Sequence, residues 1–402
     1  MAARWAPVVG LLLLLPLVPS ATSSSIAFKV DGNVYPAGHF YVTMNIGNPA
    51  KPYFLDIDTG STLTWVECDA GSGSCKTCRK VPHPLYRAQK LVPCADSMCD
   101  ALHQDLDSPK NCPDAKQCDY EIRYLDGLSS LGVLVIDHFV FPMEKAPTIA
   151  FGCGYDQQGG SSGGKAEQVD GILGLGKGSV DLVSQLKRNK IITKHVIGHC
   201  FSSKGGGYLV VGDVNVPSLA MTWVPMAPRT PGKPYYYSPG QATLLMDTKS
   251  IGAKPMKVVL DSGSTYTYLP VNIRAELISK LKASISKSLV VEPDPELPLC
   301  WKGPGRFKSP EDLKKEFKST MSLKFGNGAT MIIPPENYLI VTERGNACLG
   351  ILDMKGLDMY IIGDITLQDQ LVIYDNEKRQ LGWMRSPCDK LPKSTSPIFS
   401  RI

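Results

Sequence analysis

The chain has 402 residues, of which 43% are hydrophobic and 20% charged, and its formal net charge is +5. This composition is typical of a globular protein, and the length favours two domains over one. A net charge this small, with no basic run or aromatic-basic stripe, argues against a nucleic-acid-binding protein.

The first 24 residues predict a secretory signal peptide. Arg4 precedes an apolar stretch from Val8 to Val18, and small residues follow it. The alternative is a membrane anchor, which needs about 20 apolar residues in a row, whereas Pro7 and Pro16 interrupt this region. We therefore expect a secreted protein without a membrane anchor. The sequence also lacks an Asn-x-Ser/Thr sequon, so N-glycosylation is not expected.

The rest of the chain predicts a mainly β structure with few helices. Runs of Val, Ile, Tyr and Phe separated by Gly, Pro, Asn and Asp are typical of strands. Clear examples are residues 39–47, 208–213, 258–263 and 371–375. One helix is predicted at residues 179–191, with Ser179 as its N-cap. A second is predicted from apolar residues that share one face, namely Ile273, Leu277, Leu281 and Ile285.

Twelve cysteines in a chain with a signal peptide favour disulfide bonds. Zinc binding is the alternative, because Cys75 and Cys78 have the spacing of metal ligands, and a redox role for this pair is a further possibility. Residues 68–118 contain seven cysteines, an odd number, so complete pairing needs a partner outside this segment, and Cys153 is the nearest. We expect this segment and residues 157–165 to form loops.

An internal repeat divides the chain into two halves. Each half contains an apolar run that ends in Asp–Thr/Ser–Gly–Ser, and each has a later apolar–apolar–Gly element. The two motifs are Asp58–Ser61 and Asp261–Ser264, and the later elements lie at residues 169–176 and 359–365. We expect an N-terminal lobe over residues 25–220 and a C-terminal lobe over residues 221–402.

Two carboxylates brought together can hydrolyse a peptide bond. Hydrolysis needs a base that activates water and an acid that protonates the carbonyl oxygen. Because two adjacent carboxylates cannot both ionise easily, Asp58 and Asp261 would share one proton and supply both functions. The alternative is that each Asp only caps a turn. Capping would explain one motif but not the matched pair.

The residues around the two aspartates fit such a pair. Glycines allow two backbones to approach closely, and hydroxyl side chains can bond the opposite loop or orient a carboxylate oxygen. The predicted supporting residues are Gly60 and Gly263 for close approach, Thr59 and Ser262 for bonds across the two loops, and Ser61 and Ser264 for orienting the carboxylates.

At these motifs the chain resembles the pepsin-like aspartic endopeptidases. The resemblance covers nearly the whole mature chain and includes residues 40–61, 170–176, 261–264 and 361–364. The cysteine density, together with WVECD and FGCG, is similar to the plant nucellin-like, atypical branch. The resemblance implies two β-rich lobes related by a pseudo-twofold axis, each of which contributes one Asp to a central cleft.

The resemblance also implies roles for individual residues. Asp58 and Asp261 would be the catalytic pair, with Asp261 as the base. Tyr124 would be the tyrosine of a flap that closes over the substrate, and the indole of Trp65 would support it. The family needs neither a metal nor an organic cofactor. We therefore expect a monomeric enzyme whose partner is a protein or peptide substrate.

Three disulfide pairs are candidates. Cys300–Cys348 is implied by the resemblance, because its spacing is similar to that of a late disulfide in the family. The other two candidates are Cys200–Cys388 over a long range and Cys68–Cys153, which would resolve the odd cysteine count.

The alternative function is a catalytically inactive binding or inhibitor protein with the same fold. Plant xylanase-inhibitor proteins, which resemble inactive aspartic proteases, are of this kind. Such proteins typically lose one aspartate or break a motif, whereas this chain keeps both motifs, Tyr124 and Trp65. The sequence therefore favours the peptidase.

Overall fold

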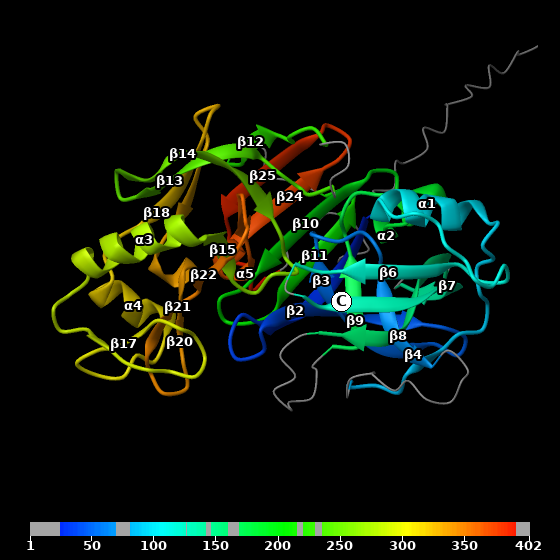
Figure 1. Cartoon of the computed structure of the whole chain (residues 1–402), viewed down its shortest axis with the longest axis horizontal. Helices are drawn as coiled ribbons and strands as arrows, with labels where there is room; N and C mark the ends of the chain where they lie inside the picture. The colour runs from blue at the N-terminus through cyan, green and yellow to red at the C-terminus, as the bar shows by residue number, and fades with distance from the viewer. Residues whose placement is uncertain are drawn as a thin grey trace, which may run out of the picture.

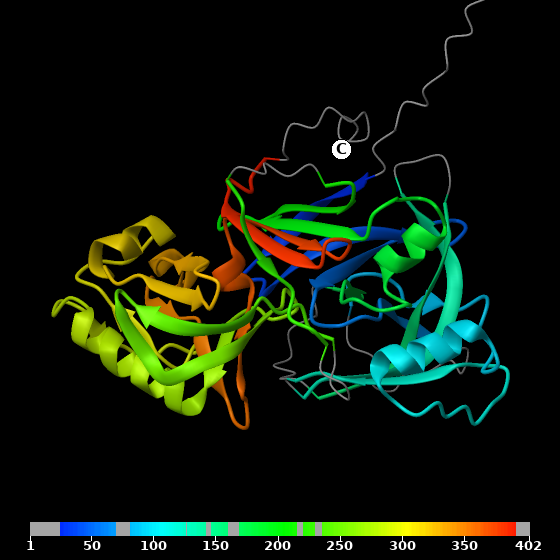
Figure 2. The same cartoon turned by 90° about the horizontal axis from the view of Figure 1, so that it is seen from above.

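A computed structural model of the chain describes residues 25–69, 81–125, 127–141, 146–159, 169–214, 220–229 and 235–390. The protein is mainly β, as predicted, and consists of two lobes that lie side by side (Figure 1). The view from above shows the helices α3 and α4 at one end of the molecule and α1 at the other (Figure 2).

Most strands belong to three sheets. The largest is 14-stranded and contains β1 (Ser25–Asn33), β2 (His39–Ile46), β3 (Lys51–Asp58), β4 (Trp65–Asp69), β5 (Tyr86–Arg87), β6 (Asp119–Arg123), β7 (Ser129–Val140), β8 (Thr148–Gln158), β9 (Gly171–Gly174), β10 (Val196–Phe201), β11 (Gly207–Gly212), β12 (Thr222–Pro225), β24 (Gln370–Asp375) and β25 (Gln380–Arg385). A 7-stranded sheet contains β13 (Gly240–Met246), β14 (Lys249–Leu260), β15 (Thr267–Pro270), β18 (Met321–Phe325), β19 (Thr330–Ile333), β22 (Ile351–Met354) and β23 (Met359–Ile362). A 4-stranded sheet contains β16 (Val290–Val291), β17 (Cys300–Lys302), β20 (Leu339–Val341) and β21 (Ala347–Leu349).

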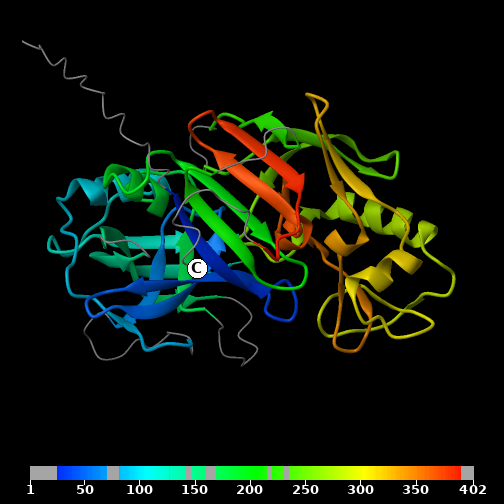
Figure 3. The same ribbon diagram turned by 180° about the vertical axis from the view of Figure 1, so that it is seen from behind.

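The largest sheet is built from both halves of the sequence. Its strand order runs β12-β25-β24-β10-β11-β1-β2-β3, so strands from the end of the chain pair with strands of the first half. Seen from behind, β24 and β25 lie beside β10 and β11 across the middle of the molecule (Figure 3). This sheet therefore crosses the boundary predicted near residue 220 and joins the two lobes.

The internal repeat appears as matched strand pairings. β3 pairs in parallel with β9 in the first half, and β14 pairs in parallel with β23 in the second. Each later strand also pairs antiparallel with the strand that follows the Asp motif, through Trp65 and Ile172 in one half and through Tyr268 and Ile361 in the other. The two halves therefore present the same topology around their aspartates.

The helices follow the predicted pattern, with one correction. α3 (Val271–Ser284) buries Ile273, Leu277 and Leu281, as the apolar spacing predicts, but the fourth predicted residue, Ile285, follows the end of the helix. α2 (Leu182–Arg188) begins after Asp181, so the predicted N-cap Ser179 is wrong. A carboxylate oxygen of Asp181 accepts the backbone N–H of Ser184 at 2.8 Å. Asp181 is thus the residue that satisfies a free N–H of the first turn.

The cysteine-rich segment is more ordered than the sequence suggested. Residues 97–106 form α1 (Ser97–Leu106), capped by Asp96, so the prediction of a loop over residues 68–118 is wrong for this part. Two local disulfides, Cys94–Cys112 and Cys99–Cys118, cross-link this segment, and Leu102 of α1 is buried in a separate apolar cluster. Likewise Gln157 and Gln158 belong to β8 rather than to a loop, and residues 160–168 lie outside the described residues.

The described residues contain five disulfides and no free cysteine. The three predicted pairs are among them: Cys68–Cys153, Cys200–Cys388 and Cys300–Cys348. Cys200 lies in β10 and Cys388 follows β25, so this bond fastens the end of the described chain to the shared sheet. Cys75 and Cys78, the basis of the zinc and redox alternatives, lie outside the described residues.

The remaining helices are short: α4 (Pro310–Glu316), α5 (Asp364–Leu367) and the 3-10 helix η1 (Pro335–Asn337). Among the described residues, no helix is both long and apolar enough to span a membrane.

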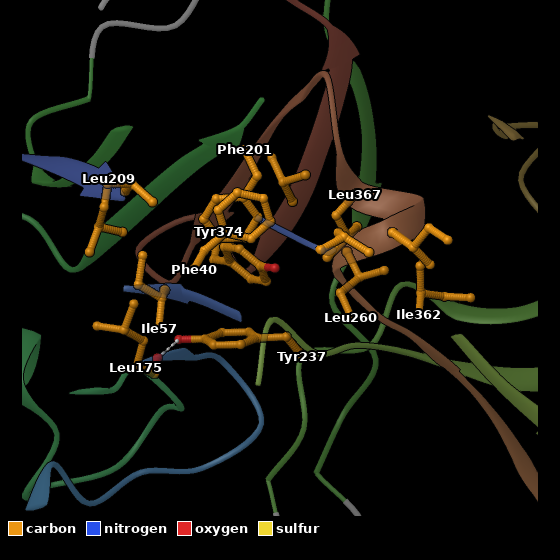
Figure 4. Packing of buried hydrophobic residues seen from close by; sticks show 14 of the residues in the cluster. Phe40, Ile57, Leu175, Phe201, Leu209, Tyr237, Leu260, Ile362, Leu367 and Tyr374 are labelled. Atoms are coloured by element: carbon orange, nitrogen blue, oxygen red, sulfur yellow. Dashed lines mark hydrogen bonds between the residues drawn. The ribbon is translucent and has the colours of Figure 1, made fainter. Parts of the chain in front are cut away.

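One continuous apolar core runs through both halves, and its centre lies beneath the two Asp motifs. Figure 4 shows aromatic residues from distant segments packed there. The rings of Phe40 and Phe201 stack with 4.4 Å between their centroids, and Tyr374 packs against Tyr237. The hydroxyl of Tyr237 donates to the carbonyl of Leu175 at 3.2 Å, which ties the second half to the first. The two lobes are therefore held in a fixed relation where the motifs meet.

Candidate active site

The two aspartates lie at the ends of equivalent strands. Asp58 is the last residue of β3, and Asp261 directly follows β14. Each loop is supported by its later Gly element: the N–H of Leu175 donates to the carbonyl of Asp58 at 2.7 Å, and the N–H of Asp364 donates to the carbonyl of Ser264 at 2.8 Å. The predicted repeat thus places both carboxyl groups at the junction of the lobes.

Hydrogen bonds cross between the two loops, as the hydroxyl residues predicted. The backbone N–H of Thr59 donates to the hydroxyl of Ser262 at 3.1 Å, and the N–H of Ser262 donates to the hydroxyl of Thr59 at 3.0 Å. Each hydroxyl also donates to the opposite backbone, that of Thr59 to Leu260 and that of Ser262 to Ile57. Both side chains are buried, so water does not compete for these bonds.

Each carboxylate is also held by its own loop. The N–H of Gly60 donates to Oδ1 of Asp58 at 2.7 Å, and the hydroxyl of Ser61 donates to Oδ2. On the other side the N–H of Gly263 donates to Oδ1 of Asp261 at 3.1 Å, and the hydroxyl of Ser264 donates to Oδ2 at 2.9 Å. All six predicted supporting residues therefore contact the pair or the opposite loop.

The two glycines permit the close approach. A Cβ atom on Gly60 would collide with the carboxylate of Asp261, and a Cβ atom on Gly263 would collide with the carboxylate of Asp58. No rearrangement of a flexible side-chain end would relieve this, because both carboxylates are fixed by the bonds just described.

Gly263→Ala is therefore expected to destabilise the protein by about 1–3 kcal/mol, the usual range for overpacking, and to lower peptide hydrolysis sharply. Thermal unfolding and initial rates would be measured together. Gly326→Ala is the control, because a Cβ atom at that exposed glycine has open space. Wild-type rates in the Gly263 variant would contradict the close-packed geometry.

Burial and mutual repulsion raise the pKa values of the pair. Burial and then the negative charge of Asp58 raise the pKa of Asp261 to about 7. Burial also raises the pKa of Asp58, although hydrogen bonds from Ser61 and Gly60 oppose the shift. The two carboxyl groups share a hydrogen bond. Both shifts favour the protonated form, so this pair is protonated more readily than two separate, exposed carboxyl groups would be.

A β-hairpin covers the pair from the side of the first lobe. β6 and β7 form this hairpin, and Tyr124 follows β6 at its tip. The indole N–H of Trp65 donates to the hydroxyl of Tyr124 at 2.7 Å. Burial and the negative charge of Asp58 raise the pKa of Tyr124 well above its ordinary value, so the phenol stays neutral. The predicted partners Trp65 and Tyr124 are thus in contact above Asp58.

The pair opens into a cleft of about 350 Å³ between the hairpin and the second lobe. Aromatic and aliphatic side chains line much of it, with Tyr124, Leu125 and Leu128 from the hairpin and Tyr236, Tyr268 and Met354 from the second lobe. Charged residues of the first lobe, namely Asp56, Asp105, Glu121 and Arg123, also belong to the lining. A cleft lined in this way, with two carboxyl groups at its base, fits an extended peptide whose apolar side chains are buried against the walls.

Two further acids near the pair were not predicted as site residues. Asp364, in the 361–364 element, is fully buried, and within the described part of the chain neither of its carboxylate oxygens has a hydrogen-bond partner. Burial and the charges of Asp56, Asp261 and Asp58 raise its pKa well above the usual range. Asp56 precedes Asp58 by two residues and lines the cleft. The sequence contained a signal for Asp56, since strand residues two apart share a face.

Among the described residues, the side-chain groups with metal-like spacing consist largely of cysteines, such as Cys94, Cys99 and Cys112. These sulfurs are bonded in disulfides, and a disulfide offers no thiolate for a metal.

Two lobes with matched topology, each with Asp–Thr/Ser–Gly–Ser at the end of a strand, define the fold of the pepsin-like aspartic proteases; here a hairpin of the first lobe lies over the pair. Residues 40–213 match the family model described as "Xylanase inhibitor N-terminal", and residues 240–385 match "Xylanase inhibitor C-terminal". The chain is 49% identical to an aspartic proteinase of Oryza sativa subsp. japonica over 100% of both chains. It is 26% identical to "Aspartic proteinase nepenthesin-1" of Nepenthes gracilis, over 89% of this chain and 80% of the relative. The chain thus belongs to the plant pepsin-like aspartic protease family.

Solved structures agree on the fold. The aspartic proteinase from Irpex lacteus superposes with a TM-score of 0.62 at 16% identity, covering 92% of this chain and 99% of the other. Conglutin gamma, a basic 7S globulin from lupine seeds, superposes with a TM-score of 0.68 at 19% identity, covering 90% of this chain and 95% of the other. The predicted bilobal, mainly β fold is therefore confirmed.

Proposed function

We propose that the protein is an aspartic endopeptidase that hydrolyses peptide bonds with a water activated between Asp58 and Asp261. The observation that carries the proposal is the pair itself: two buried carboxyl groups, mutually hydrogen-bonded and each oriented by its own loop. The ionised member takes a proton from the water as the water attacks the scissile carbonyl. The protonated member donates to the carbonyl oxygen, and the resulting tetrahedral species collapses as the amine leaves.

The electrostatics favour Asp58 as the base and Asp261 as the acid. The pKa of Asp261 is raised to about 7, with the charge of Asp58 as one cause. The backbone N–H groups of Gly60 and Ser61 both donate to Asp58, which stabilises its ionised form. This assignment is the reverse of the one implied by the family resemblance. Because the two groups titrate as a unit, this assignment says only which carboxyl group carries the shared proton in the more populated form of the pair.

In this proposal Tyr124 closes the cleft over the peptide. Its hydroxyl accepts the indole N–H of Trp65, which fixes the ring above Asp58. The exposed side chain of Leu125 next to it would be covered when a substrate occupies the cleft. Closure excludes water, which strengthens the interaction of the carboxyl groups with the reacting atoms.

The pH dependence of hydrolysis tests the mechanism. The base must be ionised and the acid protonated, so activity lies between the two apparent pKa values of the pair. Since the pKa of Asp261 is raised to about 7, the rate should be maximal in acid and fall as pH rises through neutrality. The measurement is the initial rate on a fluorogenic peptide, with and without a statine-type transition-state analogue. A rate that still rises through about pH 8 would rule out the one-proton pair.

A second candidate is a non-catalytic binding or inhibitor protein. It is supported by the descriptions of the matching family models and by the likeness to seed 7S globulins. The same experiment separates the two candidates, because a binding protein would retain the transition-state analogue or a partner without cleaving any peptide.

We also propose that the protein works in the secretory pathway or outside the cell. Five disulfides bond ten of its 12 cysteines, and such bonds persist in oxidising compartments.

A further inference from the structure

The two sides of the carboxyl pair differ in one side chain. Asp56 lies two residues before Asp58 on β3, so both side chains share one face of the strand, about 7 Å apart along it. Asp56 is half-buried and lines the cleft together with Asp58. An acid next to the reacting centre therefore faces the space that a substrate side chain would occupy.

The equivalent position in the second half is apolar. Val259 lies two residues before Asp261, as Asp56 does before Asp58. The neighbouring strands keep the same correspondence, because Asp56 pairs with Ile172 of β9 and Val259 pairs with Ile361 of β23. Within the matched topology, the position equivalent to Asp56 thus carries no charge, and its neighbour Ile361 lines the cleft.

We propose that Asp56 makes this cleft select a Lys or Arg side chain on one side of the scissile bond, with an apolar side chain on the other; this inference rests on the proposed peptidase function. The surroundings of Asp56 suit such a side chain. Ile172 and Ile122 line the same cleft and would pack along the aliphatic stem, while the cationic head reaches the carboxylate. A hydrogen-bonded pair of opposite charges is then shielded from water by the peptide.

Three other charged groups line the cleft, and each has a partner within the protein. Arg123 is a cation in the lining, and its guanidinium is bonded to Glu121 on the same exposed strand. A carboxylate oxygen of Asp105 accepts the backbone N–H groups of Ser179 and Val180, so this acid is committed to holding the loop before α2. Arg123 therefore does not replace the cation of the substrate, and neither Glu121 nor Asp105 replaces Asp56, in the proposed contact.

The test compares peptides that differ in one charge. Two fluorogenic peptides carry Lys or its uncharged isostere norleucine immediately before the scissile bond, and two more carry them immediately after it. For the wild-type protein at about pH 5, where reference carboxyl groups are ionised, kcat/KM should favour Lys by about tenfold or more on one side only. In Asp56→Asn the ratio should fall close to one on that side. Because each ratio is taken within one protein, a general change in activity cancels.

Asp358→Asn is the control, because it removes an exposed acid that does not line the cleft, and it should keep the wild-type ratio. The reversed-charge variant Asp56→Lys should instead prefer Glu over norleucine on the same side. Equal rates for Lys and norleucine in the wild type, or an unchanged ratio in Asp56→Asn, would overturn the proposal. If no peptide is cleaved, the proposed peptidase function is wrong. The selectivity of Asp56 is then measured from the affinities of the same labelled peptides. Equal Kd values for the Lys and norleucine peptides would overturn the proposed selectivity.

Discussion

Asp58→Asn and Asp261→Asn are each expected to lower peptide hydrolysis by about 10³-fold or more, since each removes half of one acid–base unit. Asn preserves the shape of the side chain but can neither ionise nor exchange the shared proton. The double variant should be little worse than either single variant, because the first change already disables the unit. Initial rates on a cleaved fluorogenic peptide would measure this.

Both variants should remain folded, because the crossed bonds of Thr59 and Ser262 do not involve the aspartate side chains. Circular dichroism and thermal unfolding would verify this. Asp358→Asn, at an exposed position just before β23, should hydrolyse peptides like the wild type. Strictly additive losses, or near-normal turnover in either single variant, would mean that the two carboxyl groups act independently.

The second large effect concerns stability against pH. Asp181 and Asp364 are buried, and burial raises the pKa of Asp181 to about 7 and that of Asp364 well above its usual range. Their stabilising contribution is complete below the unfolded pKa of about 4 and is lost as pH rises through the folded values. Between its unfolded and folded pKa values, each group lowers the free energy of unfolding by about 1.4 kcal/mol for every unit by which the pH rises. These two acids should therefore lower the unfolding temperature as pH rises from about 5 toward 8.

Asp364→Asn should reduce this loss, because the amide cannot ionise. The expected result is a smaller decrease in Tm between about pH 5 and pH 8 than in the wild type. The comparison uses the change in Tm within each protein, so any constant cost of the buried amide cancels. Asp358→Asn again serves as the control and should keep the wild-type decrease. An equal decrease in the Asp364 variant would show that Asp364 is ionised without penalty or that other groups control the transition.

The internal repeat allowed many of the site residues to be predicted from the sequence. The two Asp–Thr/Ser–Gly–Ser motifs are local patterns, and each of their hydroxyl and glycine residues has one plausible task in a paired site. The contacts of Thr59 with Ser262 and of Gly60 with the opposite carboxylate follow from those tasks. The hairpin of Tyr124 and its bond to Trp65 came from family resemblance rather than from spacing.

Other features depend on long-range packing, which no local pattern records. Asp364 looks like an ordinary first residue of a short helix, and only the assembled core makes it a buried acid. α1 was not predicted; it is cross-linked by Cys99–Cys118, and its Leu102 is buried in a cluster with Trp65, which is distant in the sequence. For α2, Ser179 and Asp181 are both good caps, and the bond to the N–H of Ser184 decides for Asp181.

The shared sheet also sets an order for folding during synthesis. β10 belongs to the first half but pairs along one edge with β24, which the ribosome delivers only near the end of the chain. Until residues 370–385 emerge, the nascent first half exposes an unpaired strand edge, where strands of other chains can add. Translation must therefore be nearly complete before β10 can pair with β24. In most proteins, by contrast, the N-terminal part of the chain folds first. Truncation before β24 should leave a first half that is prone to aggregate, and the oxidation of Cys200 with Cys388 would be among the last covalent steps of maturation.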